Sequence, residues 1–289
     1  MDQVVLRAMT KRTTIDPAPR PFLKWAGGKG QLLAELVKRV DAAGSFGRYH
    51  EPFVGGAALF FELCATGKLK KKALLSDSNA NLIEAYLGLR QSVEEVVALL
   101  ETHALQHSQD HYYATRVIVP KTLPERAARI IYLNRTCFNG LYRENSSGRF
   151  NVPMGRYDNP RICDAPNLRA VASALRKADI ECRPFETVLD RAKPGDLVYF
   201  DPPYHPVSKT SSFTAYAKGG FGEEHQRHLA QVFRELAERG VKAILSNSMT
   251  DFVRDLYADF RIDAVDATRR VNSKADRRGK IPEALIVNW

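Results

Sequence analysis

The chain has 289 residues, of which 44% are hydrophobic and 26% charged, which is enough apolar material to bury a sizeable core. Bulk disorder is excluded, and one α/β domain with a smaller lobe is expected. Lys and Arg outnumber Asp and Glu by 43 to 33. The resulting net charge of +10 favours a polyanionic partner such as nucleic acid, although solubility alone explains it equally well.

Export and metal binding find no support in the sequence. The first 20 residues have no apolar core of the length that a signal peptide needs, and nowhere are there about 18 consecutive apolar residues, the length of a spanning helix. We therefore expect a flexible leader over 1–19, no membrane segment and a cytoplasmic protein. The cysteines lack the spacing of zinc ligands or of a disulfide framework, so reduced thiols and no bound metal are expected. They are Cys64, Cys137, Cys163 and Cys182.

After the leader, the pattern alternates between helices and short strands. A glycine turn at 26–29 leads into an amphipathic helix, a strand leads into 51–56, a helix covers 57–64, and a strand over 73–77 ends on an acid. Strand, glycine turn, helix, strand and acid, in this order, begin a nucleotide-binding α/β fold.

The middle of the chain has a different texture. Helices are expected over 94–105 and 124–134, the second with a capping box formed by Thr122 and Glu125, followed by a loop-rich tract over 136–166. The alternation then returns with a strand over 196–200, a helix over 223–239, a strand over 241–246 and a closing hairpin. We predict a catalytic domain over 20–85 and 170–289, interrupted by an inserted, mainly helical domain over 86–169 that carries a β-hairpin.

The motif Asp201-Pro202-Pro203-Tyr204 directly follows an apolar strand, so it is expected at the carboxyl edge of the sheet, where open α/β folds bind ligands. The motif suits methylation of adenine N6, whose lone pair is delocalised into the ring and must be drawn toward tetrahedral geometry. The Asp201 carboxylate and the Pro202 carbonyl can each accept one N–H, and Tyr204 can stack on a flipped base. The structural alternative is a strand-ending turn, because Pro and Asp are common turn formers.

Two further segments point to a nucleotide-like cofactor. Small residues at 51–56 allow close approach to the backbone, and Asp77 follows Gly55 at close to the spacing of roughly 20 residues at which an acid binds ribose hydroxyls. A Rossmann oxidoreductase has the same pair, but this chain lacks the complete glycine fingerprint, and hydride transfer has no use for Asp-Pro-Pro-Tyr. Residues 25–29 offer an indole, a glycine turn and a cation without the spacing of a phosphate loop, which excludes an NTPase.

With these motifs in this order, residues 21–289 resemble the Dam-type DNA adenine methyltransferases of the alpha group of amino-methyltransferases. The resemblance implies a Rossmann-like fold with a mixed, mostly parallel sheet, S-adenosylmethionine as methyl donor, no metal, and double-stranded DNA as partner. It implies a catalytic set of Asp201, Pro202 and Tyr204. The implied cofactor-binding residues are Trp25, Lys29, Phe53, Gly55, Asp77, Phe185 and Asp201, with Asp77 on the ribose and Phe185 on the adenine. Ala57 departs from the family, since many relatives have glycine there, and its methyl is expected to crowd the cofactor slightly.

Target recognition is expected in residues 134–143 and 150–157, which are rich in Asn, Gly, Arg and aromatic residues. Arg143 suits a bidentate contact to guanine, an apolar side chain such as Leu141 suits a thymine methyl, and Phe138 suits a wedge between bases. Asn139-Gly140 fits a tight hairpin. A hairpin that only binds phosphates is the alternative.

The resemblance also implies a target sequence. In relatives that methylate GATC this stretch contacts the bases, and Lys24, Leu141, Arg143, Pro153 and Tyr157 fall on the contacting positions. Together with Phe138 and Asn139 they form the expected DNA-binding set, and GATC is the expected target.

Three other features carry weaker predictions. A polar loop over 206–216 is expected to close over the flipped base, and a basic cluster near the last hairpin either binds phosphates or is a solvated face. That cluster comprises Arg269, Arg270, Lys274, Arg277, Arg278 and Lys280. His103, His107 and His111 recur at helical spacing without a carboxylate or cysteine cluster, so a solvated helix face is expected rather than a metal site.

The sequence therefore predicts a DNA adenine N6-methyltransferase of a prokaryote or phage, monomeric in solution, with pairing on DNA left open. Two alternatives stay open at this point. One is an RNA or protein-amide methyltransferase of the same fold, and the other is a non-catalytic DNA-binding module with a vestigial cofactor pocket.

Overall fold

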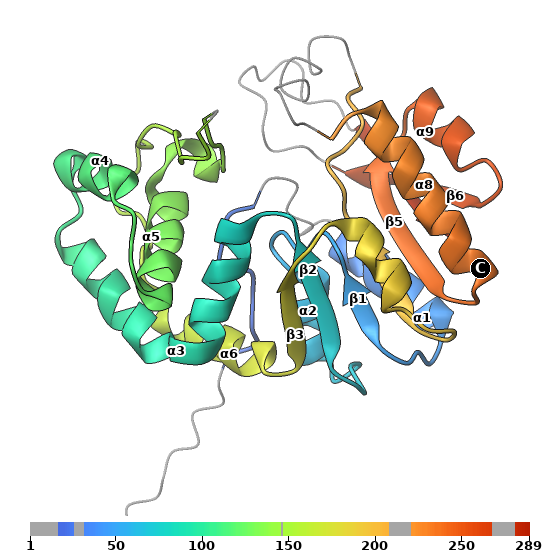
Figure 1. The fold of residues 1–289 in the computed structure, drawn as a ribbon, viewed down its shortest axis with the longest axis horizontal. Coiled ribbons are helices and arrows are strands. Elements are labelled where there is room, and N and C mark those ends of the chain that lie inside the picture. Colours follow the sequence, from blue (N-terminus) through green and yellow to red (C-terminus); the bar gives the residue numbers. More distant parts are fainter. Residues whose placement is uncertain (1–16, 26–31, 146, 208–220, 268–280) are drawn as a thin grey trace, which may run out of the picture.

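The computed structural model describes residues 17–25, 32–145, 147–207, 221–267 and 281–289. In this part of the chain, helices cover both faces of a central sheet and a helical group lies beside it (Figure 1). The helices are α1 (Leu33–Ala43), α2 (Ala58–Ala65), α3 (Ala80–Leu105), α4 (Gln109–Val117), α5 (Leu123–Thr136), α6 (Ala165–Leu175), α8 (Glu223–Glu238) and α9 (Asp251–Leu256), with 3₁₀ turns η1 (Phe138–Gly140) and η2 (Phe185–Asp190). The strands are β1 (Tyr49–Glu51), β2 (Ala73–Asp77), β3 (Ala178–Cys182), β4 (Leu197–Phe200), β5 (Lys242–Ser248), β6 (Arg261–Ala267) and β7 (Ile281–Val287).

The seven strands form one sheet in the order β3-β2-β1-β4-β5-β7-β6. Strands β1 to β5 run parallel, whereas β7 is antiparallel to both of its neighbours, β5 and β6. The predicted mixed, mostly parallel sheet and the predicted closing hairpin are therefore confirmed.

Strand β4 shows why the strands are apolar throughout. Leu197 and Tyr199 belong to a core cluster shared with α1, α2, α3 and α6, whereas Val198 and Phe200 belong to a second cluster shared with α8 and α9. Successive side chains of a strand point to opposite faces of the sheet. A sheet covered on both faces therefore requires uninterrupted apolar runs such as this one.

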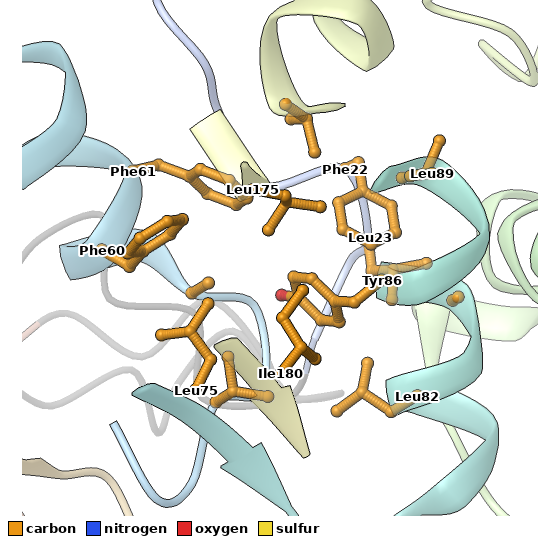
Figure 2. Close-up of a cluster of buried hydrophobic side chains, with 14 of the residues drawn as sticks. Phe22, Leu23, Phe60, Phe61, Leu75, Leu82, Tyr86, Leu89, Leu175 and Ile180 are labelled. Carbon is orange, nitrogen blue, oxygen red and sulfur yellow. The ribbon is translucent and has the colours of Figure 1, made fainter. Parts of the chain in front are cut away.

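The first core cluster also fixes the turn that follows β1. Figure 2 shows Phe22 beside Tyr86 of α3, and the two buried rings pack edge to face with centroids 4.9 Å apart. The Tyr86 hydroxyl donates a hydrogen bond of 2.8 Å to the carbonyl oxygen of Gly55. Core packing thus holds the glycine turn in which the cofactor is expected.

Helix α3 begins well before the predicted start at residue 94. The Asn79 side chain caps it by accepting the amide hydrogen of Leu82 at 3.1 Å, and the helix is interrupted at Ser92, where φ is −144° and ψ is 50°. The prediction was wrong because the first half of α3 is buried on several sides and lacks a clear polar stripe. The capping box of Thr122 and Glu125 at the start of α5 is confirmed.

The three histidines do not form a solvated face, so that prediction was wrong. Helix α4 packs on α5 and brings His111 to His103, with Nε2 and Nδ1 2.9 Å apart. The His103 ring stacks on Tyr132 with centroids 4.6 Å apart, and His107 Nδ1 lies 3.0 Å from the Tyr132 hydroxyl. Burial and then the neighbouring His111 lower the pKa of His103 to about 4. This cluster is a packing contact between helices.

Candidate active site

The carboxyl ends of β1 and β4 lie side by side, because His50 of β1 pairs with Val198 of β4. Strand β2 lies on the other side of β1, so the strand order reverses its direction between β1 and β4. In open α/β sheets, ligands bind in the crevice at such a switch point. The topology therefore brings the segment after Glu51 and the motif that begins at Asp201 to the place where a ligand is expected.

Asp201 is half-buried at the end of β4 and is held by the neighbouring strand. The Ser246 hydroxyl of β5 donates a hydrogen bond of 2.8 Å to Asp201 Oδ1 and lies 3.1 Å from the Tyr199 hydroxyl. Pro202, the next residue, is buried. Ser246 was not predicted as a site residue, because a serine within an apolar strand has no distinctive pattern.

Tyr204 is anchored by β7, the last strand along the chain. Its hydroxyl donates a 2.7 Å hydrogen bond to Glu283 Oε2 of β7. Burial first, and then the carboxylates of Asp201 and Glu283, raise the pKa of Tyr204 well above its ordinary value. The phenol is therefore neutral at physiological pH.

The glycine turn, Trp25 and Asp77 come together as the sequence predicts. Gly55 has φ +43°, and a Cβ there would lie 2.9 Å from Trp25 Cδ1, so only glycine fits. Asp77 Oδ2 accepts the Gly55 amide at 3.3 Å and Oδ1 accepts the Asn79 amide at 3.0 Å. Burial raises the pKa of Asp77.

Ala57, two residues after Gly55, also adopts a left-handed conformation, with φ 52°, and is buried. Glycine adopts this conformation more readily than alanine, so the glycine that many relatives have there suits the backbone.

Aromatic rings line the far side of the turn. Phe53 and Phe185 stack with centroids 5.3 Å apart and an interplanar angle of 21°. Phe221 packs edge-on against Phe53 at 5.6 Å, and the ring of His228 lies 5.3 Å from that of Phe185. Phe53 and Phe185 were predicted, whereas Phe221, just before α8, and His228, within α8, were not.

Glu51 is a buried carboxyl at the end of β1 that the sequence analysis did not single out. It accepts a 2.9 Å hydrogen bond from the Tyr49 hydroxyl. Burial is the main reason that its pKa is raised to about 8, and the nearby Asp201 carboxylate raises it further against the opposing effect of the Tyr49 bond. Glu51 is therefore mainly protonated near neutral pH.

The expected recognition tract contains a tight turn just after α5. Asn139 and Gly140 have φ values of 54° and 62°, and the Leu141 amide donates to the Phe138 carbonyl at 3.2 Å. The flanking segments do not pair with each other as a hairpin at this turn would require. Antiparallel bridges instead join Cys137 to Met154 and Glu144 to Phe150, so this tract pairs with the segment over 150–154.

Most of the expected base-contacting side chains are exposed on this tract. Phe138 is 49% and Leu141 38% exposed, although both are large and apolar. Lys24, Asn139, Arg143 and Pro153 are also exposed, and Tyr157 is half-buried.

Two of the side chains expected to contact bases, Lys24 and Arg143, interact with neighbouring residues of the protein. The Lys24 ammonium lies 4.2 Å from the centroid of the Tyr157 ring, and Arg143 Nε donates to Asn151 Oδ1 at 2.7 Å. The buried Asn134 amide accepts from the Lys24 amide at 2.7 Å and donates to the Gly140 carbonyl at 3.0 Å.

Several predicted features fall on other parts of the chain. Lys29, the loop over 208–216 and the basic cluster over 269–280 lie outside the described residues. Among the described residues, no group of three or more His, Cys, Asp or Glu is arranged to hold a metal ion, and no helix has the length and apolar content to cross a membrane.

Strand β2, which ends on an aspartate, and the glycine turn lie at a switch point of the sheet. Together they define an α/β protein with a site for a nucleotide-like ligand.

The family model of the D12 class N6 adenine-specific DNA methyltransferases matches residues 25–271. Two type II methyltransferases are each 41% identical to the chain: M1.LlaDCHI of Lactococcus lactis subsp. cremoris, over 93% of this chain and 95% of the relative, and M.MjaIII of Methanocaldococcus jannaschii, over 93% and 99%. The DNA adenine methylase of Escherichia coli strain K12 is 33% identical over 93% of this chain and 95% of its own. The chain belongs to the D12 class of N6 adenine-specific DNA methyltransferases.

Membership of this class implies S-adenosylmethionine as the methyl donor, and the described residues fit that molecule. The turn at Gly55 excludes a side chain, as close approach of a ligand to the backbone requires. Asp77 presents a carboxylate at the end of β2, where ribose hydroxyls are bound in related folds. The stacked rings of Phe53 and Phe185 offer an apolar surface of the kind that suits an adenine.

Proposed function

We propose that this chain transfers a methyl group from S-adenosylmethionine to N6 of an adenine in double-stranded DNA, at GATC, after the base has flipped out of the duplex. One observation carries the proposal: Asp201 lies at the end of β4, with Oδ1 oriented by Ser246, at the switch point beside the turn at Gly55. Membership of the family supports the reaction class and the DNA substrate.

In the proposed reaction, the Asp201 carboxylate and the Pro202 carbonyl each accept one hydrogen of the adenine amine. These two bonds draw the nitrogen toward tetrahedral geometry and direct its lone pair at the methyl group. The methyl donor supplies a sulfonium methyl that is already electrophilic, so alignment provides much of the rate. Asp201 and the Pro202 carbonyl therefore act by holding the amine rather than by attacking it. The N–C bond forms as the S–C bond breaks, one of the two amine hydrogens leaves as a proton, and the donor leaves as a neutral thioether.

Tyr204 is proposed to stack on the flipped adenine. A ring that receives a base must have a defined plane, and the Glu283 bond to the Tyr204 hydroxyl supplies one fixed point. Because its pKa is raised, the phenol presents no negative charge to the base.

We assign target recognition to a domain over 86–169, inserted into a catalytic domain over 20–85 and 170–289. Exposed Phe138 and Leu141 suit a wedge and a thymine contact, and Arg143 suits guanine. The exposure of these large apolar side chains supports a role in contacting a partner.

Nucleoside analysis tests the proposed reaction. The protein is incubated with S-adenosylmethionine and duplex DNA, the DNA is hydrolysed, and N6-methyldeoxyadenosine is measured by mass spectrometry, with RNA of matched sequence as a competitor. Methylated deoxyadenosine, unaffected by the RNA, is expected. Methylation of another base, or RNA that competes as well as duplex DNA, contradicts the proposal.

A further inference from the structure

Two buried amide side chains hold the backbone of the catalytic motif from outside it. Gln226 Nε2 donates a 2.8 Å hydrogen bond to the carbonyl oxygen of Pro203, and Asn247 Oδ1 accepts the His205 amide at 2.9 Å. The two amides are joined to each other, because Asn247 Nδ2 donates to Gln226 Oε1 at 3.0 Å. Pro203 and His205 flank Tyr204, so the peptide on each side of Tyr204 is fixed by this bridge.

The amide bridge, formed by Gln226 and Asn247, is buried, so its donors and acceptors must be paired within the protein. Gln226 is 1% and Asn247 0% exposed, and a buried amide is unfavourable unless its donors and acceptors are paired. Gln226 belongs to the first turn of α8 and Asn247 to the end of β5, two elements whose buried apolar side chains, such as Leu229 and Leu245, belong to the second core cluster. An apolar residue would suit the core at either position, but it could neither donate nor accept a hydrogen bond.

We propose that Gln226 and Asn247 are positioning residues that hold the Pro202 carbonyl and the Tyr204 ring in the geometry for methyl transfer. This rests on the proposed function of the motif. The proline rings fix φ at 202 and 203. The Gln226 bond then sets the plane of the peptide after Pro203, and the Asn247 bond sets the plane of the peptide after Tyr204.

The bridge complements the contacts of the motif's side chains. Ser246 orients the Asp201 carboxylate and Glu283 anchors the Tyr204 hydroxyl, but neither contact fixes the main chain between them. The Pro202 carbonyl is itself a proposed acceptor, so the main-chain geometry matters directly. A displacement of about 1 Å at a reacting centre costs on the order of 100-fold in rate.

Substitution Gln226→Glu tests the positioning role with little change of size. A protonated carboxyl can still donate to the Pro203 carbonyl, whereas an ionised one cannot. The experiment measures the single-turnover rate of methyl transfer to duplex DNA from about pH 6 to about pH 9, together with the Kd values for S-adenosylmethionine and for DNA. Gln231→Glu, on the exposed face of the same helix, is the matched control.

The rate of Gln226→Glu relative to the unsubstituted protein is expected to fall as the pH rises, by on the order of 10- to 100-fold at the upper end, with both Kd values preserved. The control is expected to follow the unsubstituted protein throughout. A constant rate ratio across the pH range overturns the proposal, whether the ratio is one or lower, and so does a loss of rate explained by weaker binding.

Two further measurements distinguish a variant that fails to fold, a wrong positioning role and a wrong proposed function. If Gln226→Glu does not fold, as judged by thermal unfolding, Asn247→Asp breaks the same bridge, since it retains the acceptor for His205 and loses the donor to Gln226. Loss of rate without loss of affinity is again expected, and an unchanged rate overturns the positioning role. An unsubstituted protein that methylates no adenine refutes the proposed function itself, whereas active protein with an equally active variant refutes the positioning role alone.

Discussion

The Ser246 hydroxyl of β5 donates a hydrogen bond of 2.8 Å to Oδ1 of Asp201, the residue that follows β4. A hydrogen bond to a charged group contributes about 1.5–3 kcal/mol. Ser246→Ala is therefore expected to lower the single-turnover rate by about 10- to 100-fold while duplex affinity is retained. Ser246→Thr keeps the hydroxyl and should retain much of the activity. A fully active alanine variant would show that Asp201 needs no such support.

Asp201→Ala is expected to abolish methyl transfer while duplex binding largely survives, because the carboxylate acts on the amine and not on the DNA backbone. Methyl transfer is measured with labelled donor and binding by fluorescence anisotropy. Asp259→Ala, at a side chain that is 75% exposed and lies outside the motif, is the control and should keep its activity. Full activity of Asp201→Ala would refute the assigned mechanism.

Tyr204→Phe and Tyr204→Ala separate the ring from its hydroxyl. The phenylalanine variant keeps the stacking surface and loses the hydroxyl with its bond to Glu283, so a small loss of rate is expected. The alanine variant loses the stack, which contributes about 1–3 kcal/mol per base in single-strand binding, so a loss of about 5- to 150-fold is expected. Fluorescence of 2-aminopurine at the target position measures the flipped state. Equal rates for the two variants would rule out stacking.

Arg143→Ala is expected to relax target choice. A bidentate contact to guanine is worth about 1–3 kcal/mol of discrimination, so substitution of that guanine should matter much less to the variant. Arg149→Ala, an exposed arginine of the same hairpin, should weaken binding similarly for all sequences. Rates on duplexes that differ at single target positions provide the measurement. Undiminished discrimination by Arg143→Ala would assign base recognition elsewhere.

Glu51 gives the protein a predicted pH dependence of stability. Burial raises its pKa to about 8, from an ordinary value of 4.5, so the folded chain keeps a proton that the unfolded chain releases. This contribution to the free energy of unfolding is full below 4.5 and is lost as the pH rises through 8, with a slope of up to about 1.4 kcal/mol per pH unit. Glu51→Gln should lack that slope in urea unfolding without cofactor. Parallel pH dependences of the two proteins would contradict it.

The sequence predicted features that depend on local patterns. Apolar runs that end on Asp77 and Asp201 indicated two parallel strands and the edge at which they end, and Thr122 with Glu125 indicated a helix start. Gly55 and Trp25 were expected near the cofactor, and the structure brings them within contact. Such features are predictable because each depends on residues close together in sequence.

Other parts of the site depend on contacts between distant segments. Ser246 comes to Asp201 across 45 residues, and Glu283 comes to Tyr204 across 79. The His103 cluster was expected in solvent because nothing in its own helix shows that α4 returns against it. Only the packing of the folded chain identifies these partners.

Transfer of labelled methyl groups to two duplexes, identical except that one contains GATC and the other has that site scrambled, tests the central claim most directly. Label in adenine of the GATC duplex alone is the predicted result. Equal label in both duplexes would refute the target, and label in neither, from folded protein that binds S-adenosylmethionine, would contradict the proposed function.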